Sequence, residues 1–292
     1  MALVALSDDA LGVVFEGLRN TLDPCVLLAL SCCKGLRAPM QALLQQLRAD
    51  HEAAAALCFK VGLRSCKELR EAKAVHWEIN NLPVADLATL GTLGSVLPAL
   101  KSLILIDRGA ASPEGVQRLA ERLGAGALPA VTWLQLTNMH VGDAGASALA
   151  VALGRGALPR LKSLWLRSAT ISDAGLVALA PALRQRPSLE VLYLTGNPLG
   201  DEGLAALVPP PLPSGALPPP TGGLKKLKEL HLRNTHITDA SCAALAAALD
   251  SGALPALEQL SLIGIPASAE AKATVYAALA KSKAAAFLPG AV

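Results

Sequence analysis

The residues that could support acid–base or nucleophilic chemistry are few, and their spacing matches no catalytic motif. His231 lies two residues after Glu229, and the repeat described below places Ser261 beside it on the adjacent strand. Polar groups meet in this way on many sheets without any reaction. The chain has no G-x-S-x-G, P-loop or H-E-x-x-H motif, and Gly222-Gly223 lacks the preceding strand of a phosphate-binding turn. We therefore predict no catalytic residue and no cofactor.

The cysteines could ligate a metal or form disulfides, but their spacing favours neither. The six are Cys25, Cys32, Cys33, Cys58, Cys66 and Cys242. None belongs to a C-x2-C pair, the usual spacing of structural zinc sites. Five lie in segments expected to be helical, so we predict reduced, buried thiols in a cytoplasmic or nuclear protein, and no metal site. The first ten residues contain Asp8 and Asp9 and no positively charged stretch, so no secretory signal is expected.

Composition and charge exclude two further classes of partner. Of the 292 residues, 52% are hydrophobic and 17% are charged, so the chain can bury a core. The mean hydropathy is +0.44, yet no uninterrupted apolar run approaches the roughly 20 residues of a membrane-spanning helix. The net charge of +3 is spread along the chain without a basic stripe. Neither a membrane nor nucleic acid is therefore an expected partner.

An internal repeat sets the elements that position the remaining polar and aromatic residues. A L-x-x-L-x-L frame occurs six times, with starts 31, 30, 28, 38 and 30 residues apart. The frames are Leu100-Leu103-Leu105, Val131-Leu134-Leu136, Leu161-Leu164-Leu166, Leu189-Leu192-Leu194, Leu227-Leu230-Leu232 and Leu257-Leu260-Leu262. Leucines two residues apart lie on one face of a strand, and the residue between them lies on the other. The frames therefore predict stacked parallel strands with their leucines buried.

A helix is expected after each frame. In four units an aspartate comes seven residues after the last leucine, and we expect it to be the helix N-cap; these are Asp143, Asp173, Asp201 and Asp239. Three of them have glycine two residues later, and Ser112-Pro113-Glu114 marks the first helix with proline at its first position. Gly-Ala-Leu-Pro ends helices at 126–129, 156–159 and 252–255, because glycine adopts the left-handed conformation and proline cannot continue a helix.

These units resemble leucine-rich repeats of the ribonuclease-inhibitor type. Residues 192–203, Leu-Tyr-Leu-Thr-Gly-Asn-Pro-Leu-Gly-Asp-Glu-Gly, match that family's L-x-L-x-x-N-x-L-x-D-x-G pattern. The family's asparagine occurs only at Asn197, because Met139, Ala169 and Thr235 take the equivalent positions. A regular asparagine ladder is therefore not expected. The resemblance implies an α/β leucine-rich-repeat solenoid, a horseshoe with a concave parallel sheet and outer helices.

The repeat domain is predicted at 73–283, with a C-terminal tail at 284–292. Its longest spacing contains a proline-rich insertion at 209–223, where seven prolines in twelve residues exclude a helix. We predict a polyproline-like loop there. The simpler interpretation is a tolerated insertion, and the alternative is a docking site for proline-binding modules.

Residues 1–72 lack the frame and are predicted to form an all-helical module. Short helices are expected at 8–18, 24–33 and 38–57, with a further turn near 65–73.

This module resembles an F-box, which docks on the Skp adaptor of a cullin ubiquitin ligase. The resemblance is carried by residues 6–11 (Leu-Ser-Asp-Asp-Ala-Leu), 14–18 (Val-Phe-Glu-Gly-Leu) and 33–36 (Cys-Lys-Gly-Leu). Ser7 and Leu36 depart from it, since the family usually has proline and tryptophan there. The resemblance implies an adaptor-binding set of Leu6, Leu11, Phe15 and Leu18. The alternative is a helical cap that only covers the first repeat.

The outward-facing strand positions supply the candidate binding residues. Two of the three tryptophans and one of the two tyrosines fall there, and Trp, Tyr and Arg dominate interface hot spots. The predicted protein-binding residues of the concave face are Trp133, Gln135, Trp165, Arg167, Tyr193, His231 and Arg233. The alternative is that the tryptophans are buried against their neighbours.

The sequence therefore predicts a non-enzymatic protein that recognises a protein target on its concave face. In one interpretation it is an F-box-type substrate receptor of a cullin ubiquitin ligase, bound to a Skp-type adaptor. One alternative is a plain binding scaffold or inhibitor without a ligase link. The other is a GTPase-activating protein of the Ran-activator type, which shares the repeat type.

Overall fold

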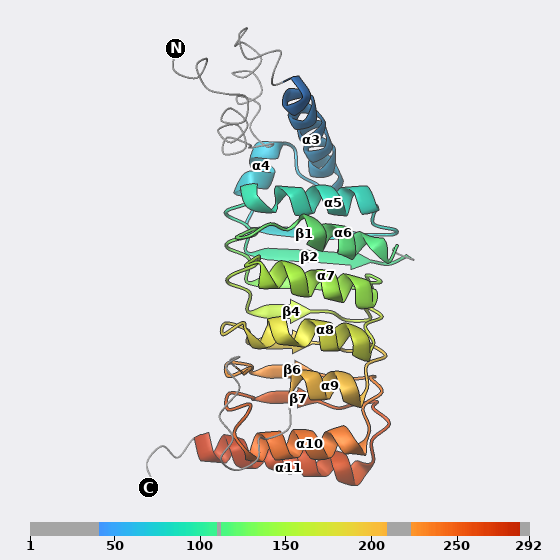
Figure 1. Cartoon of the computed structure of the whole chain (residues 1–292), viewed down its shortest axis with the longest axis vertical. Coiled ribbons are helices and arrows are strands. Elements are labelled where there is room, and N and C mark those ends of the chain that lie inside the picture. Colours follow the sequence, from blue (N-terminus) through green and yellow to red (C-terminus); the bar gives the residue numbers. More distant parts are fainter. Residues whose placement is uncertain (1–40, 110–111, 209–222, 287–292) are drawn as a thin grey trace.

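Seven parallel strands form one open sheet, in which each strand pairs with the next along the chain. The computed structural model describes residues 41–109, 112–208 and 223–286. The strands are β1 (Ala74–Ile79), β2 (Ser102–Asp107), β3 (Trp133–Thr137), β4 (Ser163–Trp165), β5 (Val191–Tyr193), β6 (Glu229–His231) and β7 (Gln259–Ser261). The order of the strands and their parallel pairing confirm the predicted α/β solenoid of repeats (Figure 1).

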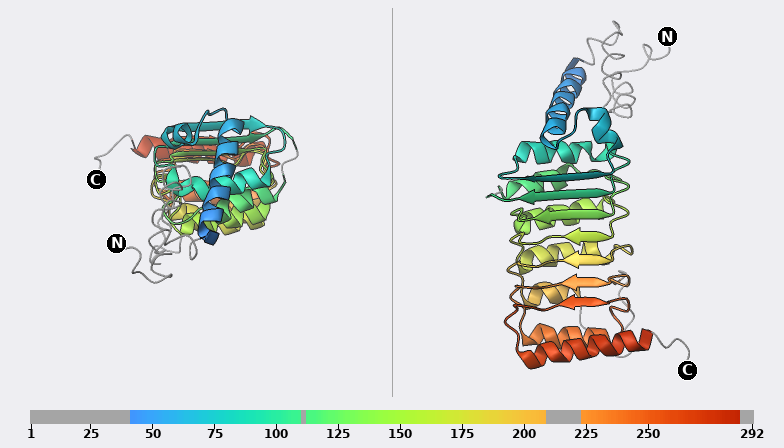
Figure 2. Two further views of the ribbon diagram at one scale, coloured as in Figure 1. Left: turned by 90° about the horizontal axis from the view of Figure 1, so that it is seen from above. Right: turned by 180° about the vertical axis from the view of Figure 1, so that it is seen from behind.

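A helix follows each strand and packs on one face of the sheet, while the opposite face carries no helix from the described residues (Figure 2). The helices are α3 (Gln41–Lys60), α4 (Cys66–Glu71), α5 (Val84–Leu93), α6 (Glu114–Arg122), α7 (Gly142–Gly154), α8 (Asp173–Arg184), α9 (Asp201–Leu207), α10 (Asp239–Asp250) and α11 (Ala269–Ala286). A short 3-10 turn at Gly94–Val96 follows α5. Each of the helices α6 to α11 packs against the one before it.

The leucine frames are buried between the sheet and the helices, as the alternation predicts, except that Leu260 of the last frame is half-buried. Leu103 and Leu105 of β2 and Leu192 of β5 have no exposed surface. β1 precedes the six frames and has no leucine of its own. Val75 and Trp77 take the inward positions there, because they are in register with Leu103 and Leu105. The sheet therefore starts one strand before the first L-x-x-L-x-L frame.

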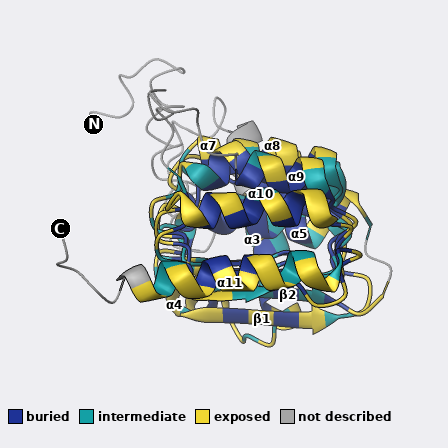
Figure 3. Cartoon of the chain, turned by 90° about the horizontal axis from the view of Figure 1, so that it is seen from below, coloured by how far each residue is buried: buried dark blue, intermediate teal, exposed yellow. Residues whose placement is uncertain are grey.

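The two ends of the stack are covered differently. α11 packs beside α10 at the C-terminal end, and its buried and exposed residues alternate along it (Figure 3). The backbone N–H of Leu262, directly after β7, donates a hydrogen bond to Tyr276 Oη on α11 at 3.2 Å. At the other end α3 packs on α5. α11 thus covers the last repeat and continues to Ala286, beyond the predicted domain end at 283.

The prediction that the repeat aspartates cap their own helices is wrong. The N-caps of α8 and α10 are Ser172 and Thr238, whose side-chain oxygens accept from the backbone N–H groups two residues later. Asp173 and Asp239 are the first residues of these helices. In the same way, Pro113 lies directly before α6 rather than inside it.

The aspartates instead bind the repeat that follows. Asp143 Oδ1 accepts from the backbone N–H of Ser172 at 2.9 Å and of Gly175 at 3.1 Å, and Asp143 Oδ2 accepts from Ser172 Oγ at 2.6 Å. Asp201 binds the backbone N–H and the hydroxyl of Thr238 in the same way, at 2.9 and 2.6 Å. Each carboxylate therefore satisfies the free N–H groups at the start of the next helix.

One asparagine joins adjacent turns where the family pattern has it. Asn197 is buried, and its Oδ1 accepts from the backbone N–H groups of Ala169 and Ile171, both at 3.0 Å. Its Nδ2 donates to the carbonyls of Leu166 and Leu194. The equivalent position one repeat later is Thr235, whose hydroxyl donates only to Leu232 O at 2.7 Å. The side chains at the family's asparagine position therefore do not form a regular asparagine ladder, as predicted.

Several predictions concern residues outside the described ranges. They are the helices at 8–18 and 24–33, the adaptor-binding residues Leu6, Leu11, Phe15 and Leu18, and nearly all of the proline-rich insertion. Within the described part of the chain, α3 and α4 occupy the places where the helix at 38–57 and the turn near 65–73 are predicted. None of the helices in the described ranges has the length and apolar character that crossing a membrane requires.

Candidate functional site

Four aromatic rings stack along the helix-free face of the sheet. Trp165, Tyr193 and His231 occupy one register position on β4, β5 and β6. Trp133 lies one strand earlier, in register with Ser163. We call Trp133, Trp165, Tyr193 and His231 the aromatic ladder. Parallel pairing at about 4.8 Å per strand brings side chains at equivalent positions into contact, so the stack of Trp165, Tyr193 and His231 follows from the repeat, while Trp133 reaches Trp165 from the neighbouring register position.

The rings of the ladder are nearly parallel and close together. The centroids of Trp165 and Tyr193 are 3.9 Å apart with an interplanar angle of 15°, and those of Tyr193 and His231 are 3.7 Å apart at 15°. Trp133 and Trp165 are 5.2 Å apart at 28°. The ring faces inside the ladder therefore cover one another, and ring edges point away from the sheet. Trp133, at one end, is 38% exposed, while the other three residues are half-buried.

Polar groups of the sheet hold the rings in place. Trp165 Nε1 donates to Ser163 Oγ at 2.8 Å. The Glu229 carboxylate serves two rings, since its Oε2 accepts from Tyr193 Oη at 3.4 Å and lies 3.4 Å from His231 Nε2. Burial, followed by the nearby Glu229 charge, raises the pKa of Tyr193 above its ordinary value. Tyr193 therefore stays protonated and donates to this carboxylate.

Charged residues border the ladder at both ends of the strands. At the amino ends Glu190 lies between two lysines, with Oε1 3.0 Å from Lys162 Nζ and Oε2 3.1 Å from Lys228 Nζ. The hydrogen bonds from Lys162 and Lys228 lower the pKa of Glu190. At the carboxyl ends Arg167 and Arg233 are exposed, and neither has an ion-pair partner among the described residues.

The remaining predicted residue, Gln135, lies in register with Trp165 and donates to Thr137 Oγ1 at 3.1 Å. All seven predicted concave-face residues therefore lie on the helix-free face or at its edge. In the alternative interpretation Trp133 and Trp165 would be buried; Trp133 is 38% exposed and Trp165 is half-buried, whereas the third tryptophan, Trp77 of β1, is 2% exposed.

Sequence reasoning missed the contribution of β1 to this face. His76 of β1 is in register with Ile104, and Glu78 binds both His76 and Arg108. The Glu78 Oε1–Arg108 Nε distance is 2.7 Å. The available signal was the alternation in Ala-Val-His-Trp-Glu-Ile, which lacks leucine.

The described residues offer little for catalysis or metal binding. Among them no group of three His, Cys, Asp or Glu side chains could hold a metal ion. The described hydrogen bond of His231 goes to Glu229 rather than to Ser261. Cys58 and Cys66 are buried with their sulfur atoms 3.9 Å apart, and burial, followed by the neighbouring Cys66, raises the pKa of Cys58 to about 12. Such a thiol is a poor nucleophile.

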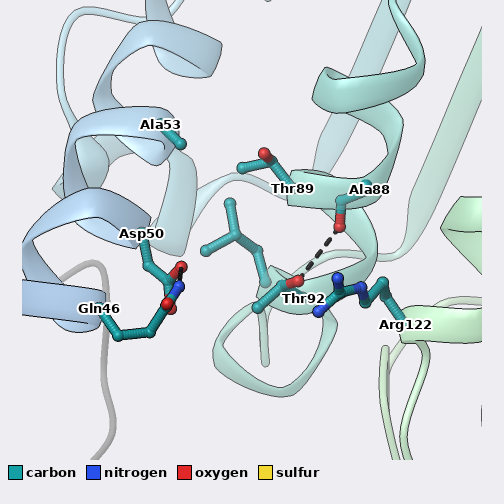
Figure 4. A pocket seen from close by; sticks show the side chains of 8 residues that line it. Gln46, Asp50, Ala53, Ala88, Thr89, Thr92 and Arg122 are labelled. Atoms are coloured by element: carbon teal, nitrogen blue, oxygen red, sulfur yellow. Dashed lines mark hydrogen bonds between the residues drawn. The ribbon is translucent and has the colours of Figure 1, made fainter. Parts of the chain in front are cut away.

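A small pocket lies between α3 and α5 and reaches Arg122 of α6; none of the ladder residues line it (Figure 4). Its volume is about 160 Å³, and Asp50, Thr89, Thr92 and Arg122 are among the residues that line it. Thr92 Oγ1 donates to Ala88 O of its own helix at 3.2 Å. The aromatic ladder therefore remains the best-defined functional candidate.

Comparison with known protein families identifies leucine-rich repeats in part of the chain. The family model described as "Leucine Rich repeat" matches residues 158–180, 186–208 and 223–246. These three segments contain β4, β5 and β6 with the starts of α8, α9 and α10. The search among curated proteins gave no match.

Among solved structures, the tropomodulin C-terminal domain of Caenorhabditis elegans is similar at 14% sequence identity with a TM-score of 0.40. The similarity covers 70% of this chain and 96% of that one. The identifiable repeats are thus those that carry most of the aromatic ladder, and the chain contains leucine-rich repeats arranged as a solenoid.

Proposed function

We propose that this protein recognises a partner protein through the helix-free face of its sheet, with the aromatic ladder at the centre of the contact. The observation that supports this most directly is the stack of four aromatic side chains, partly exposed on a face that no helix covers. Trp and Tyr bury large areas at little cost in side-chain entropy, and with Arg they dominate binding energies at interfaces. The proposed binding residues are Trp133, Gln135, Trp165, Arg167, Tyr193, His231 and Arg233.

The rigidity of the ladder favours recognition. The ring centroids of Trp165, Tyr193 and His231 are already 3.7 to 3.9 Å apart in the free protein. Hydrogen bonds to Ser163 and Glu229 fix the rings of Trp165 and Tyr193. Binding therefore orders few side chains, and the entropy lost on association is small. Open faces of repeat solenoids are extended surfaces suited to protein partners.

The test is affinity capture with the full chain, followed by identification of the captured proteins and binding measurements with each of them. Replacing Trp165 and Tyr193 together with alanine should weaken binding of the true partner at least about 30-fold, as expected for a pair of central hot spots. Phe59→Ala is the matched control, because Phe59 is 71% exposed on α3, away from the ladder. Equal binding by the ladder variant and the control would remove this surface from consideration.

We further propose that residues 1–72 dock a Skp-type adaptor, so that the protein acts as a substrate receptor of a cullin ubiquitin ligase. The support is the F-box-like pattern that contains Leu6, Leu11, Phe15 and Leu18. Co-purification with the adaptor should occur and should be lost in Phe15→Asp, while capture of the concave-face partner persists. If the unmodified chain does not co-purify with an adaptor, the protein is a plain binding scaffold or inhibitor.

A further inference from the structure

Two rows of charged residues run along the aromatic ladder, one on each side. The backbone N–H of Glu190 donates to Lys162 O, and that of Lys228 donates to Glu190 O, both at 2.7 Å. These three residues therefore occupy one register position before the strands. On the other side Ser168 N donates to Thr195 O, and Gly196 N donates to Arg233 O, both at 2.8 Å. Arg167, Thr195 and Arg233 therefore occupy one register position after the strands.

The two rows differ in how their charges are neutralised. In the first row Lys162 and Lys228 share the single carboxylate of Glu190. In the second row the guanidinium groups of Arg167 and Arg233 are exposed, and no carboxylate among the described residues pairs with them. Unpaired guanidinium groups on a binding face are the groups that bind carboxylates most effectively.

The charge around the ladder is positive overall. The two rows, together with Glu229, which contacts the ladder, contain four basic residues, Lys162, Arg167, Lys228 and Arg233, and two acidic ones, Glu190 and Glu229, which is a net charge of +2. Glu229 is engaged by Tyr193 and His231, and Glu190 is engaged by Lys162 and Lys228. The charged side chains of this surface that have no ion pair among the described residues are therefore Arg167 and Arg233, which lie beside the aromatic rings.

The stacking geometry favours a protein partner over a nucleic acid. Single-stranded nucleic acids bind aromatic side chains by stacking bases on their faces. Here the inner faces of Trp165, Tyr193 and His231 cover one another at 3.7 to 3.9 Å, so no base can enter between them. The exposed edges of aromatic rings carry partial positive charge and attract carboxylate and carbonyl oxygens. A polypeptide with acidic side chains fits this edge-on surface better.

We infer that the partner presents an acidic segment of polypeptide, whose carboxylates pair with Arg167 and Arg233 while its apolar side chains lie on the ladder. This inference rests on the proposed function and specifies the chemistry of the partner. Arg167 and Arg233 follow β4 and β6, which are two strands apart in the sheet, and this separates them by about 10 Å at 4.8 Å per strand. Carboxylates two turns apart on a helix have this separation, since each residue rises about 1.5 Å.

The experiment uses the full chain and a fluorescently labelled 12-residue peptide of glutamate, leucine and alanine. The glutamate peptide should bind, and its glutamine counterpart should bind at least about tenfold more weakly. Added salt should lower the affinity of the glutamate peptide. The double variant Arg167→Gln/Arg233→Gln should lose about tenfold in affinity, as expected for two solvent-exposed ion pairs. Arg155→Gln is the matched control, because Arg155 is an exposed arginine at the end of α7, away from the ladder.

Three results with the peptides would overturn the inference. They are failure of the glutamate peptide to bind, equal binding of the glutamine peptide, and equal weakening by Arg155→Gln and the double variant. Tighter binding of a 12-residue oligothymidylate than of the peptide would assign the surface to nucleic acid instead. The proposed function is judged separately with the captured partner. A partner lost from the Trp165/Tyr193 variant but kept by the arginine variant would support recognition at the ladder and refute the acidic segment.

Discussion

The carboxylate of Asp173 and the backbone N–H of Gly203 bind each other across a repeat boundary, with an Oδ1–N distance of 2.8 Å. The same oxygen accepts from the N–H of Gly200 at 2.6 Å. Asp173 belongs to α8, whereas Gly203 lies in the first turn of α9. One side chain thus satisfies the free N–H groups of the next helix and attaches that helix to its own repeat.

Gly203→Ala should destabilise the fold by about 1–3 kcal/mol, the usual cost of forcing an atom into a filled space. A Cβ at this position would lie 2.7 Å from Asp173 Oδ1, so the carboxylate would have to move and lose its hydrogen bonds. Gly154→Ala is the matched control, because a Cβ there meets nothing within 4 Å. Urea unfolding of both variants measures the difference. Similar free energies of unfolding would show that the glycine is not required by this contact.

Asn197→Ala should destabilise the fold by at least about 2 kcal/mol, because two buried backbone donors lose their partner. These donors are the N–H groups of Ala169 and Ile171. Thr235→Val is the control at the equivalent position, where a single hydrogen bond to Leu232 O is lost. Its expected cost is about 1 kcal/mol. Thermal and urea unfolding should rank the two variants in this order, and the reverse order would contradict the assigned role of Asn197.

The strands could be predicted from the sequence wherever leucines recur at the spacing of the L-x-x-L-x-L frame. Six strands carry the L-x-x-L-x-L frame, and their leucines are buried except Leu260 of β7, which is half-buried. β1 has Val75 and Trp77 where β2 has Leu103 and Leu105, and these side chains fill the inward space with other shapes. The alternation in β1 is visible in the sequence, but without leucines it does not identify the strand as part of the repeat.

The aspartates show a different limit of sequence analysis. Asp173 stands directly after a good N-cap, Ser172, and either residue could cap a helix by type. Only the distance between adjacent repeats decides that the Asp173 carboxylate reaches α9. The glycine two residues after Asp173 and Asp201 was visible in the sequence, but the reason for it was not. Gly175 and Gly203 leave room for the carboxylates of Asp143 and Asp173 in the preceding repeat.

For the candidate site, strand alternation was sufficient to identify which residues share a face. It did not reveal that the rings stack, or that the Glu229 carboxylate contacts both Tyr193 and His231, because both depend on side-chain torsion angles. It also left open which arginines lack partners, since Arg108 pairs with Glu78 whereas Arg167 and Arg233 have no counterpart in the described ranges.

Stability should depend on pH through Glu190. Its two lysine partners lower its pKa below the value in the unfolded chain, so the folded state binds fewer protons in the interval between the two values. The resulting stabilisation is fully present above the unfolded-state pKa and is lost as the pH falls through the folded-state value. The difference in free energy of unfolding between the natural chain and Glu190→Gln should therefore be larger at pH 7 than at pH 3.

The control for this prediction is Glu258→Gln. Glu258 occupies the same position of the repeat as Glu190, but it is exposed and has no ion pair with any described residue. Its substitution should leave the pH dependence of unfolding unchanged. Identical pH profiles for the two glutamine variants would show that the lysine pair does not stabilise the fold through Glu190.

The aromatic ladder should act as a coupled unit in the folded protein. If stacking of Trp165 on Tyr193 contributes beyond the burial of each ring, the two alanine substitutions will not be additive. The expected coupling energy in a double-mutant cycle is about 0.5–1.5 kcal/mol, since such pairs exceed their area burial by that amount. Trp165→Ala combined with Phe59→Ala provides the uncoupled reference, because Phe59 lies on α3 and is not part of the stack. Additive losses in both cycles would mean that the 3.9 Å contact contributes nothing beyond burial, and the argument that a prestacked surface lowers the entropy cost of binding would lose its basis.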